Sequence, residues 1–229
     1  MSDNQLWVNL NKFADEIRAE FDNDLVRYED PRYEEVIENP GFEGWTDTFW
    51  TGPNIRKAHL KTVEIDKQWL LHINIFPEDG CNYPILGFDI VASHRKATGS
   101  FFDLSSVSDY EHPVQLIYHE QVKDLKWRRP RKLPEWAQQI FSDDMLAIGG
   151  LDTGPELDQL MEISMKIIKL YLMMSPAQNI KTDVSTKTGL NKYCHYQKQN
   201  PHLHRAITAM GISDKAKDMY IENILFEEI

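Results

Sequence analysis

The chain has 229 residues, of which 41% are hydrophobic and 27% charged, and its 25 Lys and Arg against 36 Asp and Glu give a formal net charge of −11. This composition excludes a disordered chain and predicts a single globular domain over residues 1–229. The negative charge argues against general binding to nucleic acid or to membrane surfaces, because both are polyanions. No apolar stretch reaches the length of a spanning helix, and residues 1–5 lack a secretion signal pattern, so we expect a cytoplasmic protein.

Residues that could hold a cofactor are sparse. The two cysteines, Cys81 and Cys194, form no CxxC pair, which excludes a disulfide framework and an iron–sulfur or zinc ligand set. The histidines His195, His202 and His204 lack carboxylate or thiolate neighbours at ligand spacing, so we expect no metal site. The glycine-rich motifs of nucleotide-binding folds are missing from the sequence. Any redox chemistry would therefore need electrons from an outside donor.

The N-terminal segment has helical spacing. Apolar residues recur every three or four positions after the potential N-caps Ser2, Asp3 and Asn4, and they predict an amphipathic helix: Leu6, Leu10, Phe13, Ile17 and Phe21. Residues 22–54 predict irregular structure, with at most a short strand around Trp45 and Trp50.

Residues 55–118 predict a β-meander. The runs HLKTVEI, QWLLHINIF, ILGFDIVAS and SFFDLSSVS are separated by short turns, the first of them Asp66-Lys67. Because connections of two to eight residues join antiparallel neighbours, we expect a meander of about four to six strands.

Helical spacing returns after residue 118. We expect five helices: from Pro134, from Pro155 to a point before Pro176, over 183–198, after the N-cap and proline pair Asn200-Pro201, and from Ser213 through Phe226. An antiparallel sheet with helices before and after it in sequence predicts an α+β fold, most economically a three-layer α/β/α sandwich with a central antiparallel sheet.

Polar residues interrupt the apolar strands. His72 and Asn74 share one face of their strand, and Asp89 is flanked by apolar residues on the next. A desolvated acid and imidazole on neighbouring strands would have shifted, coupled proton affinities suited to protonating a bound substrate. A hydrogen-bonded pair with only a structural role fits the same spacing. Asp103 repeats the pattern, although it is equally compatible with the start of a turn.

Two further groups of charged residues are notable. His59 and Lys61 share a strand face and Glu64 lies on the other, which is compatible with an ordinary salt bridge at a strand edge. Residues 123–132, KDLKWRRPRK, hold six cationic residues against one acid, Asp124. This positive segment suits an acidic protein surface or the carboxylates of a ligand, and simple solvation is the alternative.

Several motifs together resemble one family. His72 and Asp89 are separated by sixteen residues that include FPE and PILGF, and this spacing is followed by SFFDLSSVS, RKLPEWAQQIFS, YCHYQKQN and the ending YIENILFEEI. From about residue 50 to the C-terminus the chain resembles the ferredoxin-dependent bilin reductases. The resemblance implies an α/β/α sandwich that holds biliverdin IXα, an open-chain tetrapyrrole, between the sheet and the C-terminal helices.

The resemblance also implies a mechanism. Reduced ferredoxin, with a [2Fe–2S] cluster, supplies single electrons, each coupled to protonation of a substrate radical, with no flavin or metal bound. By position, Asp89 matches the aspartate that protonates the tetrapyrrole and His72 its partner histidine. His59 matches a second histidine near the substrate, and Arg131 an arginine that pairs with a propionate. Four residues complete the expected substrate-binding set: Asn74, Asp103, Asn200 and Lys61.

Two departures from the family pattern bear on the product. Members that form phycocyanobilin carry a glutamate two residues after the first histidine, where this chain has Lys61. Its loss favours phycoerythrobilin as the product, formed through 15,16-dihydrobiliverdin as in the phage-associated branch. Asn200 stands where many members have an aspartate; it caps a helix equally well but cannot donate a carboxyl proton. The alternatives are a two-electron reductase that stops at 15,16-dihydrobiliverdin, a phycocyanobilin-forming enzyme that uses Glu64 or another acid, and a non-catalytic bilin-binding protein.

The expected partners follow from this assignment. They are ferredoxin and biliverdin, with heme oxygenase or a bilin lyase as pathway neighbours, and the expected location is the cytoplasm of a cyanobacterium or its phage-infected host. We expect a monomer by default.

Overall fold

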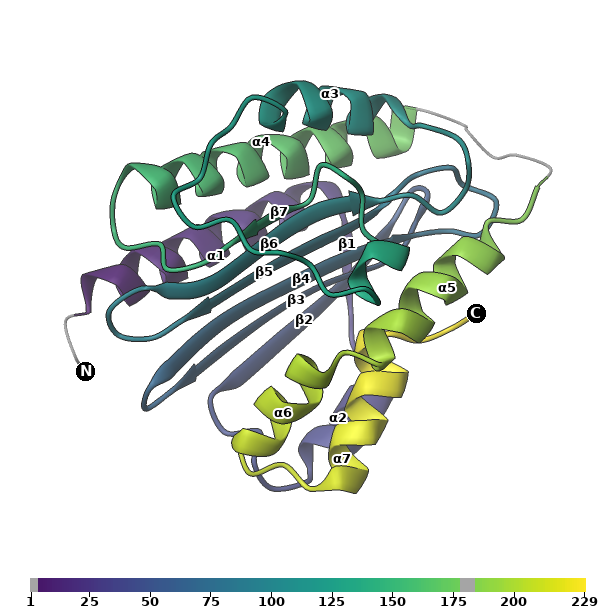
Figure 1. The fold of residues 1–229 in the computed structure, drawn as a ribbon. Coiled ribbons are helices and arrows are strands. Elements are labelled where there is room, and N and C mark those ends of the chain that lie inside the picture. The colour runs from purple at the N-terminus through teal and green to yellow at the C-terminus, as the bar shows by residue number, and fades with distance from the viewer. Residues whose placement is uncertain (1–3, 178–183) are drawn as a thin grey trace.

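A computed structural model describes residues 4–177 and 184–229. Within these residues seven strands form one antiparallel sheet in the order of the sequence, β1-β2-β3-β4-β5-β6-β7 (Figure 1). The strands are β1 (Val26–Tyr28), β2 (Trp45–Gly52), β3 (Ile55–Ile65), β4 (Gln68–Pro77), β5 (Ile85–Ala92), β6 (Ala97–Ser105) and β7 (Leu146–Ile148). The predicted α+β sandwich with a central antiparallel sheet is confirmed.

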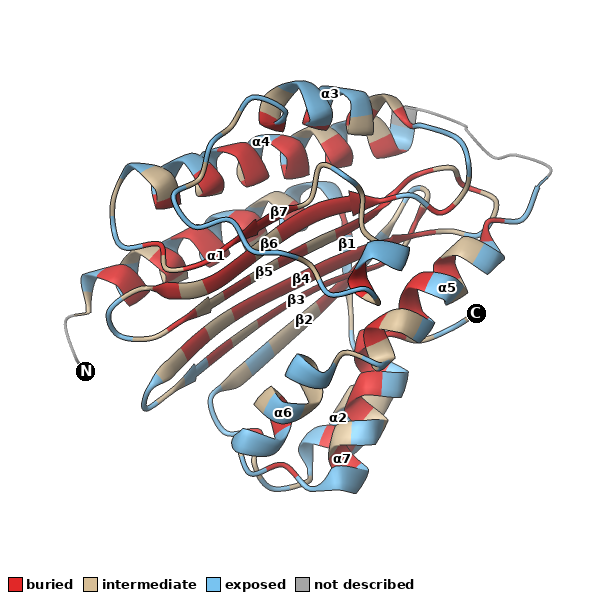
Figure 2. Ribbon diagram, in the orientation of Figure 1, coloured by how far each residue is buried: buried red, intermediate tan, exposed pale blue. Residues whose placement is uncertain are grey.

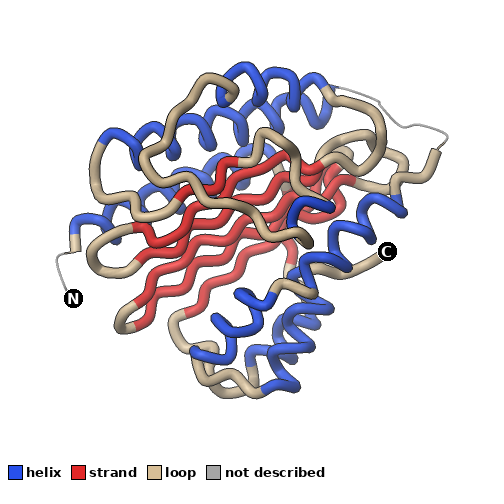
Figure 3. Tube along the Cα trace, in the orientation of Figure 1, coloured by secondary structure: helices blue, strands red, loops and turns tan. Residues whose placement is uncertain are grey.

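Helices cover both faces of the sheet (Figure 3). The helical elements are α1 (Gln5–Asp24), α2 (Pro31–Ile37), α3 (Pro113–Val122), the 3₁₀ turn η1 (Ala137–Gln139), α4 (Pro155–Ala177), α5 (Lys187–Lys198), α6 (Pro201–Ala209), α7 (Asp214–Met219) and the π-helix η2 (Tyr220–Leu225). We call the face that carries Leu71, Ile73 and Ile75 of β4 the packed face, and the face that carries His72 and Asn74 the site face.

Each face has its own apolar cluster. On the packed face the strands bury their side chains against α1, α3 and α4. On the site face a second cluster joins α2, α5, α6, α7 and η2 to residues such as Phe49 and Phe76. The strands are consequently buried along most of their length (Figure 2).

The N-terminal helix forms as predicted. The Asn4 side chain accepts a hydrogen bond from the Leu6 N–H at 3.1 Å, which identifies Asn4 as the N-cap among the predicted choices. The five apolar residues of the predicted stripe are all buried: Leu6, Leu10, Phe13, Ile17 and Phe21. The helix therefore closes the packed face.

The predicted meander of about four to six strands within residues 55–118 is confirmed, because β3, β4, β5 and β6 follow one another there. Residues 22–54, predicted to be largely irregular, instead contain β1, α2 and the eight-residue β2, and with β7 they extend the sheet to seven strands. The last strand, β7, has only three residues and pairs with β6 from a distant part of the chain. Such short edge strands depend on tertiary pairing more than on their own periodicity.

Three predicted helix and strand boundaries were also wrong. Residues up to 118 were assigned to the meander, yet α3 begins at Pro113 with a capping box formed by His112 and Gln115. The helix predicted from Pro134 is only the turn η1, because Ile140 leaves the helical conformation at φ −131°. The helix from Pro155 continues past Pro176 to Ala177.

The C-terminal helices follow the sequence signals more closely. Asn200 caps α6 through the His202 N–H at 3.0 Å, and Ser213 caps α7 through the Ala216 N–H at 3.3 Å. The final helix ends in a π-helical turn instead of regular α-helix, a feature often found at functional sites. The predicted helix over 183–198 corresponds to α5, and its proposed start at residue 183 lies outside the described residues. Among the helices that the structure describes, none is both long and apolar enough to cross a bilayer.

Candidate active site

The polar residues of the site face lie in two neighbouring rows that cross the sheet. Strand pairing places Asp47, Lys61, His72, Asp89 and Phe101 opposite one another on β2 to β6. The same pairing forms a second row two residues along each strand, made of Phe49, His59, Asn74, Gly87 and Asp103. The register therefore gathers all six predicted strand residues and adds Asp47, which the sequence analysis missed.

His72 and Asp89 form the predicted pair. His72 Nδ1 lies 2.7 Å from Asp89 Oδ1, and Asn74 Nδ2 lies 3.0 Å from His72 Nε2. Because an amide NH₂ can only donate, Nε2 accepts and neutral His72 carries its hydrogen on Nδ1, directed at Asp89. The Asp89 side chain is 41% exposed, whereas that of His72 is 10% exposed. The buried histidine therefore holds the acid by a hydrogen bond from the neighbouring strand, while the acid itself is partly exposed.

A second imidazole–carboxylate contact lies beside the first. His59 Nε2 lies 2.6 Å from Asp47 Oδ1, and both side chains are fully buried. The Tyr220 hydroxyl of η2 donates to the same Asp47 oxygen at 2.5 Å. Burial lowers the pKa of His59 to about 4 despite Asp47. Burial alone would raise the pKa of Asp47, but His59, Lys61 and Tyr220 together hold it below its usual value. At neutral pH the contact therefore joins a neutral imidazole to a carboxylate.

Lys61 is a buried cation in the first row. It is 3% exposed, and its Nζ lies 4.4 Å from the Trp45 ring centroid and 4.9 Å from that of Tyr220. Burial lowers the pKa of Lys61 to about 8, although Asp47 and Asp89 favour the charged form. Glu64, by contrast, accepts from Asn11 of α1 at 3.0 Å and therefore faces the opposite side of the sheet.

Asp103 lies inside β6, and the alternative that it starts a turn is wrong. Its carboxylate accepts from Ser105 Oγ at 2.5 Å and from the Ser142 N–H at 3.1 Å, and the Ser142 hydroxyl also donates to it. Burial raises the pKa of Asp103 to about 6 in spite of these hydrogen bonds. Asp103 therefore ties the loop after η1 to the sheet.

A cavity of about 380 Å³ opens over the site face between the sheet, α5, α6 and residues 131–145. Four predicted site residues line it: Asp89, Asp103, Arg131 and Asn200. Tyr193 and Gln197 of α5 close it from the helical side, joined by a 2.9 Å hydrogen bond. The volume is in the range of small-molecule sites. His59, Lys61, His72 and Asn74 lie in the sheet beside or beneath this cavity instead of on its wall.

Arg131 lies at the rim of the cavity. Its backbone N–H donates to the Ala147 carbonyl at 2.7 Å, and its guanidinium donates to the Thr98 carbonyl and lies 5.7 Å from the Phe101 ring centroid. A Cβ on Gly149 would approach Arg131 Nε to 2.7 Å. Glycine at 149 therefore leaves room for the guanidinium, which can hold a carboxylate in two hydrogen bonds.

The positive segment 123–132 is partly neutralised. Lys123 pairs with Glu120 at 2.6 Å, and Arg128 pairs with Glu156 of α4. Within the described residues no ion pair involves Arg131, whose guanidinium donates to Thr98, or the other cations Lys126, Arg129 and Lys132. The last three are the charges available to an acidic partner.

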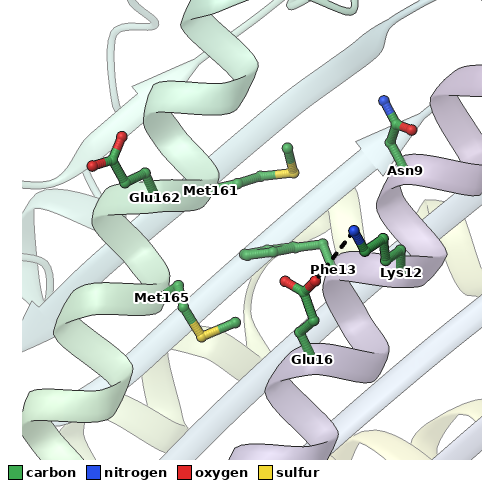
Figure 4. Close-up of a pocket in the computed structure, with 7 residues that line it drawn as sticks. All are labelled: Asn9, Lys12, Phe13, Glu16, Met161, Glu162 and Met165. Carbon is green, nitrogen blue, oxygen red and sulfur yellow. Dashed lines mark ion pairs between the residues drawn. The ribbon is translucent and has the colours of Figure 1, made fainter.

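Other parts of the described structure offer less chemistry. A shallow groove of about 320 Å³ lies between α1 and α4, lined by residues such as Lys12, Phe13 and Met165 (Figure 4). It lies on the helical layer of the packed face, away from the acid and imidazole groups. Among the described residues, no three His, Cys, Asp or Glu side chains are grouped as metal ligands.

Comparison with known proteins agrees with this geometry. Residues 30–227 match the family of ferredoxin-dependent bilin reductases. The phycocyanobilin:ferredoxin oxidoreductase of Synechococcus sp. (strain CC9605) is 31% identical over 179 residues, covering 76% of this chain and 72% of the relative. That of Gloeobacter violaceus is 29% identical over 178 residues, covering 75% and 69%.

Solved structures share the fold. A PcyX protein superposes with a TM-score of 0.69 at 23% identity, covering 96% of this chain and 99% of the other. Phytochromobilin synthase from tomato, solved in complex with biliverdin, superposes with a TM-score of 0.68 at 17% identity, covering 96% and 82%. The chain belongs to the ferredoxin-dependent bilin reductase family and is a bilin oxidoreductase.

Proposed function

We propose that this enzyme reduces biliverdin IXα to phycoerythrobilin through 15,16-dihydrobiliverdin. Four electrons arrive singly from the [2Fe–2S] cluster of reduced ferredoxin, and each is coupled to protonation of a substrate radical. The observation that carries the proposal is the hydrogen-bonded pair of His72 and Asp89. Its acid is exposed in the cavity, while its buried histidine is also hydrogen-bonded to Asn74. A relative of the same fold binds biliverdin, which supports the choice of substrate.

The proposed roles follow from position. Asp89 is the proton donor to the tetrapyrrole and His72 resupplies and orients it. Arg131, at the rim, holds a propionate, and Asp103 and Asn200 line the substrate cavity. His59, Asn74 and Lys61 act from the sheet beneath, where they fix the charge and hydrogen bonding of the pair.

The product follows from Lys61. Family members that form phycocyanobilin need an acid at this position to protonate the outer vinyl group, and Lys61 is instead a buried cation between two aromatic rings. Glu64 faces the other side of the sheet, which argues against it as a substitute acid. These two observations favour phycoerythrobilin over phycocyanobilin.

Asn200 bears on the second reduction. Its side chain is engaged as the N-cap of α6 and lines the cavity, but an amide supplies no carboxyl proton. If A-ring reduction requires a carboxylic acid here, the reaction stops at 15,16-dihydrobiliverdin. We propose that a different proton source serves A-ring reduction.

We further propose that the chain acts as a single domain and as a monomer in the cytoplasm. Its pathway neighbours would be heme oxygenase, which acts before it, and a bilin lyase, which acts after it.

The decisive test is an anaerobic assay with biliverdin, ferredoxin and a system that keeps ferredoxin reduced, followed by absorption spectra and product chromatography. We expect phycoerythrobilin, with 15,16-dihydrobiliverdin appearing first. Phycocyanobilin would contradict the role assigned to Lys61, and a halt at dihydrobiliverdin would show that Asn200 blocks the second step. Biliverdin binding with no reduction would leave a bilin-binding protein.

A further inference from the structure

Asp47 fixes the orientation of His59. The ionised Asp47 carboxylate can only accept hydrogen bonds, so His59 Nε2, 2.6 Å away, carries the hydrogen that it donates. The neutral imidazole therefore has its lone pair on Nδ1. This is the arrangement in which a buried acid sets the tautomer of a histidine that exchanges protons through its other nitrogen.

His59 Nδ1 is the atom that this arrangement leaves available. It is buried and has no hydrogen-bond partner among the described residues, which is unfavourable for a buried polar atom. The His59 ring is stacked on Phe49 at 4.7 Å between centroids, and it meets the His72 ring edge-on at 5.7 Å. The unpaired nitrogen thus belongs to a ring held rigidly next to the His72–Asp89 pair.

The surroundings of this contact are rich in positive charge. Groups that act on it come from several elements: Lys57 and Lys61 of β3, His72 of β4, Tyr33 of α2 and Tyr220 of η2. Burial is the largest effect that disfavours a protonated His59, Lys57 and His72 add to it, and Asp47 is the carboxylate that opposes them. Without that charge the pKa of His59 would lie still further below its usual value.

We propose that Asp47 is a positioning residue for proton transfer through His59, so that the site face holds two imidazole–carboxylate pairs instead of one. A proton that arrives at His59 Nδ1 forms an imidazolium whose charge Asp47 stabilises at Nε2, and release of that proton restores the neutral ring. Two pairs suit a reaction that consumes a proton with each electron. The inference rests on the proposed function and deepens it.

The test compares Asp47→Asn with Tyr220→Phe in the full chain. Asp47→Asn removes the charge that stabilises imidazolium, so the limb on which kcat falls with rising pH should move to lower pH by about one unit or more, with kcat lowered about 10- to 1,000-fold. Tyr220→Phe removes a competing donor from Asp47 Oδ1, strengthens the remaining contact with His59 and should move the limb to higher pH. Biliverdin affinity should change less than about threefold in both variants.

Opposite shifts of the pH profile are the outcome that a merely structural contact does not produce. Thr46→Asn, on an exposed neighbouring position of β2, is the matched control and should leave the profile unchanged. If Asp47→Asn fails to fold, Asp47→Glu and Tyr220→Phe carry the test, and Asp47→Glu should retain most of the wild-type profile. If the wild-type protein is active and the variants have the same pH profile of kcat as the wild type, the role of Asp47 is overturned and the proposed function stands. A wild-type protein that reduces no biliverdin overturns the proposed function itself.

Discussion

The two faces of the sheet are built from the same strands but serve different ends. On the packed face, β4 contributes Leu71, Ile73 and Ile75, each fully buried against the layer of α1 and α4. One residue along, the site face of the same strand carries His72 and Asn74. Alternation along a strand is therefore enough to place a stabilising core and a polar site back to back.

The difference is also energetic. Burial of apolar side chains on the packed face stabilises the fold by about 25 cal/mol per Å². On the site face burial is costly for charged groups, as the lowered pKa of Lys61, about 8, and the raised pKa of Asp103, about 6, both show. Apolar burial on the packed face therefore offsets the free-energy cost of burying charged groups on the site face.

The largest expected effect is that of Asp89→Asn on turnover. The variant keeps a hydrogen-bond acceptor for His72 but loses the carboxyl proton, so kcat should fall about 10²- to 10⁴-fold. Because the Asp89 side chain is 41% exposed, the melting temperature and the biliverdin dissociation constant should change little. Single-turnover absorption spectroscopy measures the loss, and wild-type turnover in this variant would remove Asp89 from the mechanism.

Ile73→Ala tests the packed face with the opposite signature. Ile73 is fully buried in the cluster on that face, so its truncation should lower the free energy of unfolding by about 2–5 kcal/mol. At a temperature where the variant is folded, kcat and the product should match those of the wild type. Denaturant unfolding together with the assay checks both, and a changed product would mean that the two faces are not separable.

Asp103→Asn should alter how stability depends on pH. The pKa of Asp103 is about 6 in the folded state and 3.8 in the unfolded chain, so protonated Asp103 favours the folded state. Its contribution to the unfolding free energy is fully present below pH 4, and about 3 kcal/mol of it is lost as pH rises through 6. Asparagine cannot ionise, and the difference in unfolding free energy between variant and wild type should therefore move by about that amount in favour of the variant between pH 4 and 7. Urea titrations across this range measure the difference; a constant offset would show that Asp103 does not titrate there.

The smallest expected effect concerns the positive segment at the cavity rim. Lys126→Glu combined with Arg129→Glu reverses two cations that have no ion-pair partner in the described chain, so the apparent KM for ferredoxin should rise about 3- to 10-fold and lose salt dependence. Arg128 is a poorer choice because it already pairs with Glu156. Lys192→Glu with Lys215→Glu, exposed on α5 and α7 and without an ion pair among the described residues, makes the same charge change as a control. Equal effects of the two double variants would rule out a local docking surface.

Much of the fold was predictable because its signals are local. The stripe of α1, the two-residue turn between β3 and β4, and the caps Asn200 and Ser213 each depend on a few adjacent residues. By contrast, β7 and the turn η1 depend on residues far along the chain. Strand β7 pairs with Phe102 of β6, and the loop after η1 is held by the hydrogen bond from Ser142 to Asp103. Local patterns carry no record of such partners.

The site divides in the same way. The sequence by itself determined the alternation that puts His72, Asn74 and Asp89 on polar positions, and its motifs determined the family. Only the tertiary structure decided that Asp47 lies opposite Lys61 and binds His59, and that of the two acids lining the cavity Asp89 is exposed while Asp103 is buried. The physical reason is that register between strands and the seating of helices are set by packing across the whole sheet, whereas the face on which a residue lies is set by its own strand.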